Sequence, residues 1–441
     1  MSLVDTIQHL GIEHHFKNQI ADALRSTVFG YLQVYEFNRF KDMNGTFKMD
    51  LVKEPKGLLS LYNAAHLLTH DELALDEAIC FSRLHLESIR QNLETVRRIE
   101  ALNYMSEYEH EPSYNPIILE LAKMEFNVLQ NIHLKKLKAV SEWWQDLYAE
   151  VALSYARDRT VHLYLWAHTM CYEKEYSCAR VTLTKLSALV TMMDDTYDVR
   201  ATLEEGRSFK EAIQRWNENA VCLLPEYIDL KIFYLRIIMT FEEIEYVLEP
   251  HEKYEVSYTK ESFQTLSKYY LQGAEWFHHN YMPTFKEKQE VGFMDSGSPF
   301  SVVALLVGMG DLATKEALEW AIGCTDAVKA CGELTRYMND ISALKHGNRK
   351  QDAANCMECY VAEYNVTTEV AIAKISQMME DAWKTTNKAL LELRSLHGVV
   401  RRVVNMTVCV TLIYGIKKDV FTFGNDLDEI IYHMFAHPIP I

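Results

Sequence analysis

The sequence has few residues that interrupt helices. Among 441 residues there are nine prolines and 16 glycines, and no proline lies between Pro116 and Pro225 or between Pro299 and Pro438. Gly206 is the only glycine in the first of these spans. Because proline and glycine mark most helix ends and turns, long tracts without them that are rich in Leu, Ala, Glu and Lys predict one helix after another. Sustained alternation of apolar and polar residues is also missing, so we expect an all-α fold without a sheet.

Other absences restrict the class of protein. No apolar run is long enough to cross a bilayer. The first residues show neither the basic start and apolar core of a signal peptide nor the composition of a transit peptide, so we expect a cytoplasmic protein. The nine cysteines are scattered, as is typical of reduced thiols, and the single CxxC pair, Cys356 and Cys359, lacks the partners that a zinc site needs. The net charge of −17 argues against a nucleic-acid partner.

The length allows two or three domains. A polar turn at residues 109–116 is followed by one further helix, and the break between domains is expected soon after it. We therefore predict a smaller helical domain at residues 1–138 and a larger one at residues 139–441, which is near the upper limit for a single core.

The most informative motif follows an apolar helical stretch at residues 179–193 and reads Asp-Asp-Thr-Tyr-Asp. On a helix, Asp194 and Asp198 point the same way, whereas Asp195 is turned aside. Two like carboxylates at the end of an apolar helix repel each other, and a divalent cation such as Mg²⁺ relieves this repulsion. An acidic helix end exposed to solvent is the alternative interpretation.

Two further motifs carry cations and oxygen ligands. Arg157 and Arg159 would converge only on a loop, where guanidinium groups make good bidentate partners for diphosphate oxygens. Arg336 and Asn339 lie three residues apart, hence on one helix face, with oxygen ligands available. Taken singly, each motif is also compatible with a purely structural ion-pair cluster.

In this order, the motifs Arg-x-Arg, Asp-Asp-x-x-Asp and Arg-x-x-Asn-Asp resemble those of the class I terpene synthases of plants, in particular the sesquiterpene cyclases. The similarity extends over nearly the whole chain. It includes SEWW at 141–144, YLW at 164–166, YSCAR at 176–180, AIQRW at 212–216, LPEY at 224–227, YMPT at 281–284, GMGD at 308–311, ECY at 358–360 and the tail from residue 414 to 441.

The resemblance implies an all-α class I helical bundle preceded by a smaller helical domain. It implies an enzyme, a carbon–oxygen lyase, in which Mg²⁺ (or Mn²⁺) and arginines draw diphosphate away from a prenyl chain whose cation then cyclises. The substrate that we expect is farnesyl diphosphate. The metal ligands that it implies are Asp194, Asp198 and Asn339. The implied substrate-binding residues are Arg157, Arg159, Arg336, the aromatic pocket wall Trp166, and Asp195 as an orienting partner.

Tyr414 and Asp419 match a pair of residues on the loop that caps the pocket. In the family this pair is associated with deprotonating or shaping the final cation. We also expect a monomer.

The second metal motif departs from the family pattern. Counted from Asn339, the usual Ser or Thr position holds Ala343 and the usual Glu position holds Gly347. Ser342, three residues from Asn339, is expected to be able to face the metal instead. We therefore expect the metal cluster to be bound weakly or to be completed by the substrate.

The alternative to an active enzyme is a degenerate family member that binds metal or diphosphate with little turnover. A third interpretation is a chain-elongating prenyl transferase, but that class uses two Asp-rich motifs and this sequence contains one.

The family's amino-terminal segment, with its paired arginines and distal tryptophan, is not matched, and a second gap is expected near residues 25–35. We therefore expect a chain that is truncated at its amino terminus, with lower stability and easier entry of water into the pocket. Products quenched early by water would follow.

Overall fold

The computed structural model describes residues 6–7, 10–16, 19–20, 40–43, 45–53, 55–89, 100–111, 114–151, 154–225, 228–344, 353–414, 420–423 and 427–441. Over these ranges the regular structure is helical, and the β structure is limited to an isolated bridge between Lys41 and Phe47. The predicted all-α fold is confirmed. None of the helices in these ranges combines the length and hydrophobicity needed to cross a membrane.

The chain forms two compact units, Met1–Leu134 with Asp428–Ile441, and Lys135–Leu427. We predict a domain boundary after residue 138; the boundary between the compact units falls four residues earlier, inside one long helix. The carboxyl-terminal residues pack with the first unit, where both polar groups of the Asn127 side chain bind the backbone of Ile439 at 2.8 Å. A side-chain amide thus holds the chain end against this helix.

The first unit contains short helices and two small apolar clusters, one around Tyr104 and Leu119 and one around Leu61 and Ile79. Its elements are η1 (Glu13–Phe16), η2 (Met49–Lys53), α4 (Pro55–Ala65), α5 (Leu73–Ile89), α6 (Glu100–Tyr108), the first half of α7 (Pro116–Val151) and α21 (Asp428–Phe435).

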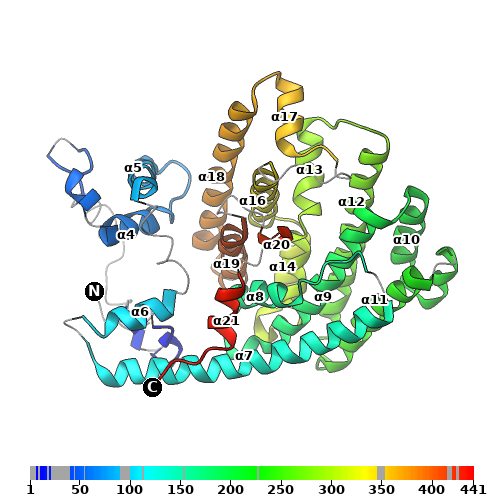
Figure 1. Cartoon of the computed structure of the whole chain (residues 1–441), viewed down its shortest axis with the longest axis horizontal. Helices are drawn as coiled ribbons and strands as arrows, with labels where there is room; N and C mark the ends of the chain where they lie inside the picture. Colours follow the sequence, from blue (N-terminus) through cyan, green and yellow to red (C-terminus); the bar gives the residue numbers. More distant parts are fainter. Residues whose placement is uncertain are drawn as a thin grey trace. The chain divides into compact units, whose positions relative to one another are not determined.

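The second unit is a bundle of longer helices (Figure 1). Beyond the second half of α7 its elements are α8 (Thr160–Met170), η4 (Lys174–Tyr176), α9 (Ser177–Asp195), η5 (Thr196–Arg200), α10 (Leu203–Arg215), η6 (Glu218–Leu223), α11 (Ile228–Val247), α12 (Tyr254–His278), α13 (Phe285–Asp295), α14 (Ser298–Leu306), η7 (Gly310–Leu312), α15 (Lys315–Ile322), α16 (Asp326–Ala343), α17 (Cys356–Tyr364), α18 (Thr368–Glu392), α19 (His397–Tyr414) and α20 (Val420–Phe423).

Local sequence signals explain where these helices begin. Thr284 caps α13 through a reciprocal capping box with Glu287, and Asn355 caps α17 in the same way with Glu358. Between α13 and α14 the chain turns through Gly297, whose φ of +72° lies in the left-handed region that glycine tolerates. This turn ends α13 at Asp295 and starts α14 immediately afterwards.

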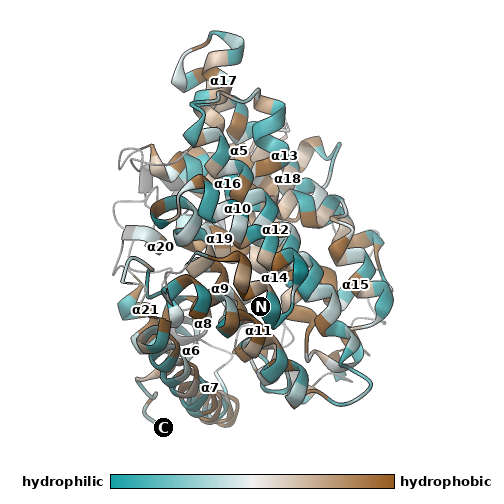
Figure 2. Cartoon of the chain, turned by 90° about the vertical axis from the view of Figure 1, so that its right-hand side faces the viewer, coloured by the Kyte–Doolittle hydropathy of each residue, from teal (hydrophilic) through white to brown (hydrophobic). Residues whose placement is uncertain are grey.

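A continuous apolar core joins α8, α9, α12, α14, α16 and α19. Hydrophobic ribbon is concentrated along α8, α9 and α14 in Figure 2, in agreement with the buried side chains that these helices contribute. Because this core is closely packed, the helices around it are rigid supports for the polar side chains described next.

Candidate active site

The second unit contains a cavity of about 240 Å³ between its central helices. One part of its wall is apolar and includes Leu163, Trp166, Leu183, Val190, Met406 and Phe421. Another part is charged or polar and includes Arg157, Asp194, Asp198, Asp295, Arg336 and Asn339. A cavity with one apolar part and one charged part suits a ligand with a hydrocarbon body and an ionic head.

The Asp-rich motif lies where α9 ends and the chain widens into the π-helical turn η5. The wider turn is closed by the hydrogen bond from the Ala201 N–H to the Thr196 carbonyl, at 2.8 Å. Asp194 and Asp198 both line the cavity, as their spacing predicts, whereas Asp195 is buried beside them. The widened turn therefore presents two carboxylates to one space.

Arg157, on the loop before α8, binds both neighbouring carboxylates. Its Nη2 lies 2.8 Å from Oδ2 of Asp194 and 2.8 Å from Oδ1 of Asp195. Its backbone N–H and its Nε donate to Oδ2 of Asp195 at 2.8 and 3.1 Å. Burial raises the pKa of Asp195, and the charge of Arg157 opposes that effect. Asp195 is thus an anchor for Arg157, and Oδ1 of Asp194 makes no hydrogen bond or ion pair with any described residue.

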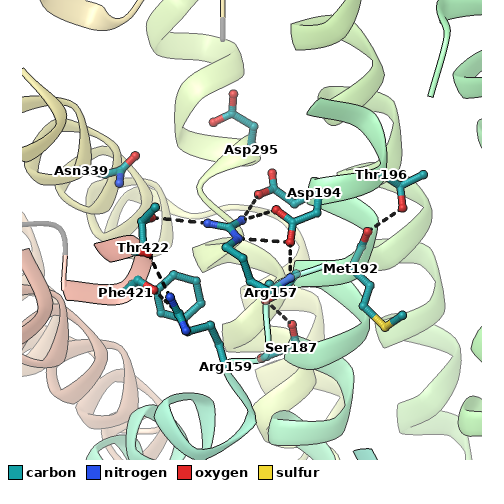
Figure 3. A network of polar contacts seen from close by, with 12 residues as sticks. Arg157, Arg159, Ser187, Met192, Asp194, Thr196, Asp295, Asn339, Phe421 and Thr422 are labelled. Carbon is teal, nitrogen blue, oxygen red and sulfur yellow. Dashed lines mark hydrogen bonds and ion pairs between the residues drawn. The ribbon is translucent and has the colours of Figure 1, made fainter. Parts of the chain in front are cut away.

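Arg159 is held by the backbone of α20. Its Nε donates to the carbonyl of Phe421, and its Nη2 donates to the carbonyl of Thr422 at 2.9 Å. Figure 3 shows both arginines reaching towards this short helix, with Arg157 also 3.4 Å from the hydroxyl of Thr422. Both arginines lie on the loop before α8, and their guanidinium groups connect the Asp-rich motif to α20, but Arg157 lines the cavity whereas Arg159 is not among its lining residues.

On α16 the cationic group is Arg336. Its Nη2 lies 2.8 Å from Oδ1 of Asp295 on α13, and its Nη1 lies 3.3 Å from Oδ1 of Asp340. Nη1 also donates to the side-chain oxygen of Asn339 at 3.2 Å, so these two side chains share one helix face as expected. Arg336 and Asn339 both line the cavity.

One expectation about the second motif is wrong. Ser342 is buried and donates its hydroxyl hydrogen to the backbone carbonyl of Asn339 at 2.8 Å, and it does not line the cavity. Ala343 lines the cavity instead, because a position four residues on from Asn339 stays on the inward face of α16, whereas Ser342 is turned into the core. Gly347 lies outside the described residues.

The remaining predicted residues concern the apolar part. The Trp166 ring meets the Phe421 ring edge to face at a centroid distance of 6.3 Å, and its buried indole N–H has no hydrogen-bond partner among the residues that the structure describes. Tyr414, the last residue of α19, lines the cavity. Asp419 lies outside the described residues. An aromatic wall therefore faces the space beside the charged groups.

The polar residues of this wall that the sequence interpretation missed include Tyr270 on α12, and Lys288 and Asp295 on α13. Burial raises the pKa of Tyr270 far above its usual value, and the charges of Asp194 and Asp295 add to the effect. Lys288 and Asp295 stand seven residues apart, so they share one face of α13. In the sequence, the only signal that could have identified these two residues was the seven-residue spacing of opposite charges within a predicted helix.

The donor set is suited to a divalent ion that the substrate helps to bind. Among the described residues, no three His, Cys, Asp or Glu side chains converge into a ready metal cage. Asp194 and Asp198 offer carboxylate oxygens, and Asn339 offers an amide oxygen, to one cavity. Mg²⁺ is commonly held by one or two carboxylates and completes its shell with water and phosphate oxygens. The residues present fit such an ion.

Comparison with known proteins agrees with this geometry. The family model "Terpene synthase family, metal binding domain" matches residues 145–385, and "Terpene synthase, N-terminal domain" matches residues 30–105. Tau-cadinol synthase from Zea mays is 44% identical, covering 100% of this chain and 88% of the relative. Alpha-copaene synthase from Zea mays is 41% identical, covering 100% of this chain and 91% of the relative.

Solved structures show the same fold. Isoprene synthase from Populus x canescens, in complex with three Mg²⁺ ions and dimethylallyl-S-thiolodiphosphate, superposes with a TM-score of 0.85 at 26% identity, covering 99% of this chain and 92% of that chain. The chain belongs to the terpene synthase family. It is therefore an enzyme of the lyase class, and its curated relatives include several synthases of sesquiterpenes.

Proposed function

We propose that this enzyme ionises farnesyl diphosphate and cyclises the resulting cation to a sesquiterpene, with release of diphosphate. The observation that carries the proposal is the convergence of Arg157, Asp194 and Arg336, from three distant segments, on the charged part of one cavity whose other part is apolar. The names of the curated relatives, which include bisabolene and humulene synthases, support the length of the substrate.

We assign the diphosphate to the charged part. Asp194, Asp198 and Asn339 would hold divalent metal, Mg²⁺ in the first place and Mn²⁺ as a substitute. Such an ion, when bound, supplies positive charge to the leaving diphosphate. Arg157, Arg159 and Arg336 supply further positive charge as the carbon–oxygen bond breaks, and Asp195 orients Arg157. Guanidinium groups suit this task because they bind phosphate oxygens in pairs.

We assign the prenyl chain to the apolar part. Aromatic faces such as those of Trp166 and Phe421 stabilise a cation without reacting with it. In this proposal the apolar lining disfavours water, which would otherwise capture the cation before it cyclises. Tyr414 is the last residue of α19 and lines the cavity. In this proposal it shapes the final cation together with Asp419.

The test is to incubate the purified chain with geranyl, farnesyl and geranylgeranyl diphosphates and Mg²⁺, and to identify the products. Sesquiterpenes formed from farnesyl diphosphate support the proposal. Longer prenyl diphosphates would point to chain elongation, and the absence of any product would point to the degenerate alternative.

We also propose a monomer in the cytosol, because the chain resembles farnesyl diphosphate cyclases. Size-exclusion chromatography tests the oligomeric state, and cell fractionation tests the location.

A further inference from the structure

Lys288 is a buried lysine whose charged group has no protein partner among the described residues. The residue is 6% exposed, lies on α13 and lines the cavity. Its ammonium makes no hydrogen bond and no ion pair with any residue that the structure describes. A lysine ammonium that lines the cavity and has no direct hydrogen-bond or ion-pair partner among the described residues is free to bind an anionic ligand there.

The nearby carboxylates are already engaged elsewhere. Asp295 and Asp340 bind the Arg336 guanidinium at 2.8 and 3.3 Å, and the second oxygen of Asp340 accepts the backbone N–H of Cys356 at 2.8 Å. Burial disfavours the charged form of Lys288, but the fields of Asp295 and Asp340 outweigh burial and raise the pKa of its ammonium above the usual value. The thiol of Cys356 stays neutral, because burial raises its pKa well above the usual value.

The side chain of Arg336 crosses α13 between Lys288 and Asp295. It passes over Gly292, where an added Cβ would lie 3.0 Å from Cγ of Arg336. Residues 288, 292 and 295 occupy one helix face, and both Lys288 and Arg336 line the cavity. Two cations thus face the space to which we assign the diphosphate.

The position of Lys288 also coincides with the altered part of the second metal motif. α13 and α16 pack antiparallel: Gly332 meets the carbonyl of Phe293, Arg336 crosses Gly292, and Tyr337 receives a 2.7 Å hydrogen bond from Gln289. Lys288 therefore lies towards the end of α16 that carries Asp340 and Ala343. At this end the sequence offers a methyl group in place of an oxygen ligand.

We propose that Lys288 binds the substrate diphosphate directly and supplies positive charge at the end of α16 where Ala343 removes a metal ligand. The inference rests on the proposed function, since it assumes that the cavity holds a prenyl diphosphate. It identifies Lys288 as a further substrate-binding residue, and it implies that the enzyme depends less on divalent ions at this end of the cavity than an intact second motif would require.

The competing explanation is that Lys288 only balances the charges of Asp295 and Asp340. In that case its removal would lower the stability of the fold and leave the affinity for diphosphate unchanged. If Lys288 contacts the ligand, its removal weakens diphosphate binding even when the fold is intact.

The experiment measures the affinity of the full chain for inorganic pyrophosphate by titration calorimetry, with and without Mg²⁺. Lys288→Met removes the charge, and Lys288→Arg keeps it. Lys286→Met is the matched control, because Lys286 lies on the same helix with its side chain 84% exposed. We expect Lys288→Met to weaken binding roughly ten- to hundred-fold, the range for a buried charged hydrogen bond. Lys288→Arg should stay within a few-fold of the parent, and Lys286→Met should be unchanged.

Unchanged pyrophosphate affinity in a folded Lys288→Met chain would overturn the inference. If that variant does not fold, Lys288→Gln takes its place with the same criterion. The proposed function fails separately: a parent chain that makes no product from any prenyl diphosphate would refute it, whereas a Lys288-dependent affinity for pyrophosphate would still establish the anion site. If the parent chain makes sesquiterpene but substitution of Lys288 does not change the affinity for pyrophosphate, the inference about Lys288 is refuted and the proposed function stands.

Discussion

Arg157 and Asp194 form an ion pair at the cavity wall, with Nη2 of the arginine 2.8 Å from Oδ2 of the aspartate. The same nitrogen lies 2.8 Å from Asp195, so one guanidinium group joins two adjacent carboxylates that differ in burial. In the proposed reaction both Asp194 and Arg157 face the diphosphate. Asp195 stays behind them and fixes their positions, and the two aspartates should therefore respond differently to the same substitution.

We expect Asp195→Asn to lower the free energy of unfolding by roughly 1–3 kcal/mol, because a buried acceptor of two Arg157 hydrogen bonds is weakened. Asp194→Asn should leave stability almost unchanged and should reduce turnover about 10²- to 10³-fold, the usual loss when a group that stabilises the transition state is removed. Thermal unfolding and product formation rates measure the two effects. Equal losses of stability in both variants would contradict the distinction.

Ala343→Ser should strengthen metal binding, because it restores an oxygen on the inward face of α16. We expect the Mg²⁺ concentration for half-maximal activity to fall by roughly three- to tenfold, the gain from about one additional polar ligand contact. A parent enzyme that already saturates at the low Mg²⁺ levels of an intact site would contradict the premise that its cluster is bound weakly.

Ser342→Ala provides the matched control for this prediction. Its hydroxyl is bonded to the carbonyl of Asn339 and does not line the cavity. Its removal should therefore leave the Mg²⁺ dependence unchanged while Ala343→Ser alters it. A shift of the metal requirement in Ser342→Ala would restore the original expectation that Ser342 faces the metal.

Trp166→Leu should change the products rather than the binding of substrate. Loss of the aromatic face removes a cation–π contact of about 0.5–2 kcal/mol, which corresponds to a roughly two- to thirtyfold shift in the partition between competing cations. Trp166→Phe should shift products less, since it keeps an aromatic face and the indole N–H bonds to none of the described residues. Gas chromatography of products from farnesyl diphosphate measures both. An unchanged product pattern in the leucine variant would mean that Trp166 is core packing alone.

The fold and the motif positions could be predicted because they depend on local sequence. The shortage of Pro and Gly predicts the helices, and helical spacing predicts that Asp194 and Asp198 share a direction and that Arg336 lies beside Asn339. The π-helical turn after Asp195 was not predictable in this way, because its shape depends on how residues 196–200 pack against α12.

The second metal motif shows the limit of spacing arguments. Three-residue spacing made Ser342 a plausible ligand, but on α16 the hydroxyl turns to a backbone carbonyl, which a serine in a helix readily does. Lys288 and Asp295 were missed because each is an ordinary charged residue in the sequence. Their importance arises from the crossing of Arg336 over Gly292, a contact between two helices that no local pattern specifies.

Glu255 on α12 makes stability depend on pH. It is buried, accepts the Gly308 N–H at 2.9 Å, and burial raises its pKa to about 7. In the unfolded chain the pKa of a glutamate is near 4.3. The folded state therefore holds this proton more tightly, so the contribution of Glu255 to stability is complete below about pH 4.3 and is lost as the pH rises through 7.

Glu255→Gln should remove that dependence, since the amide stays neutral and its oxygen can still accept the Gly308 N–H. When the pH rises from 5 to 8, the free energy of unfolding should fall more in the parent than in the variant. The difference between the two should be at most about 3 kcal/mol, which is the limit that the pKa shift of Glu255 sets over this pH range. Denaturant unfolding at several pH values measures this difference. Glu261→Gln, an exposed change on the same helix, should keep the slope of the parent. A slope that survives in Glu255→Gln would place the titrating group elsewhere.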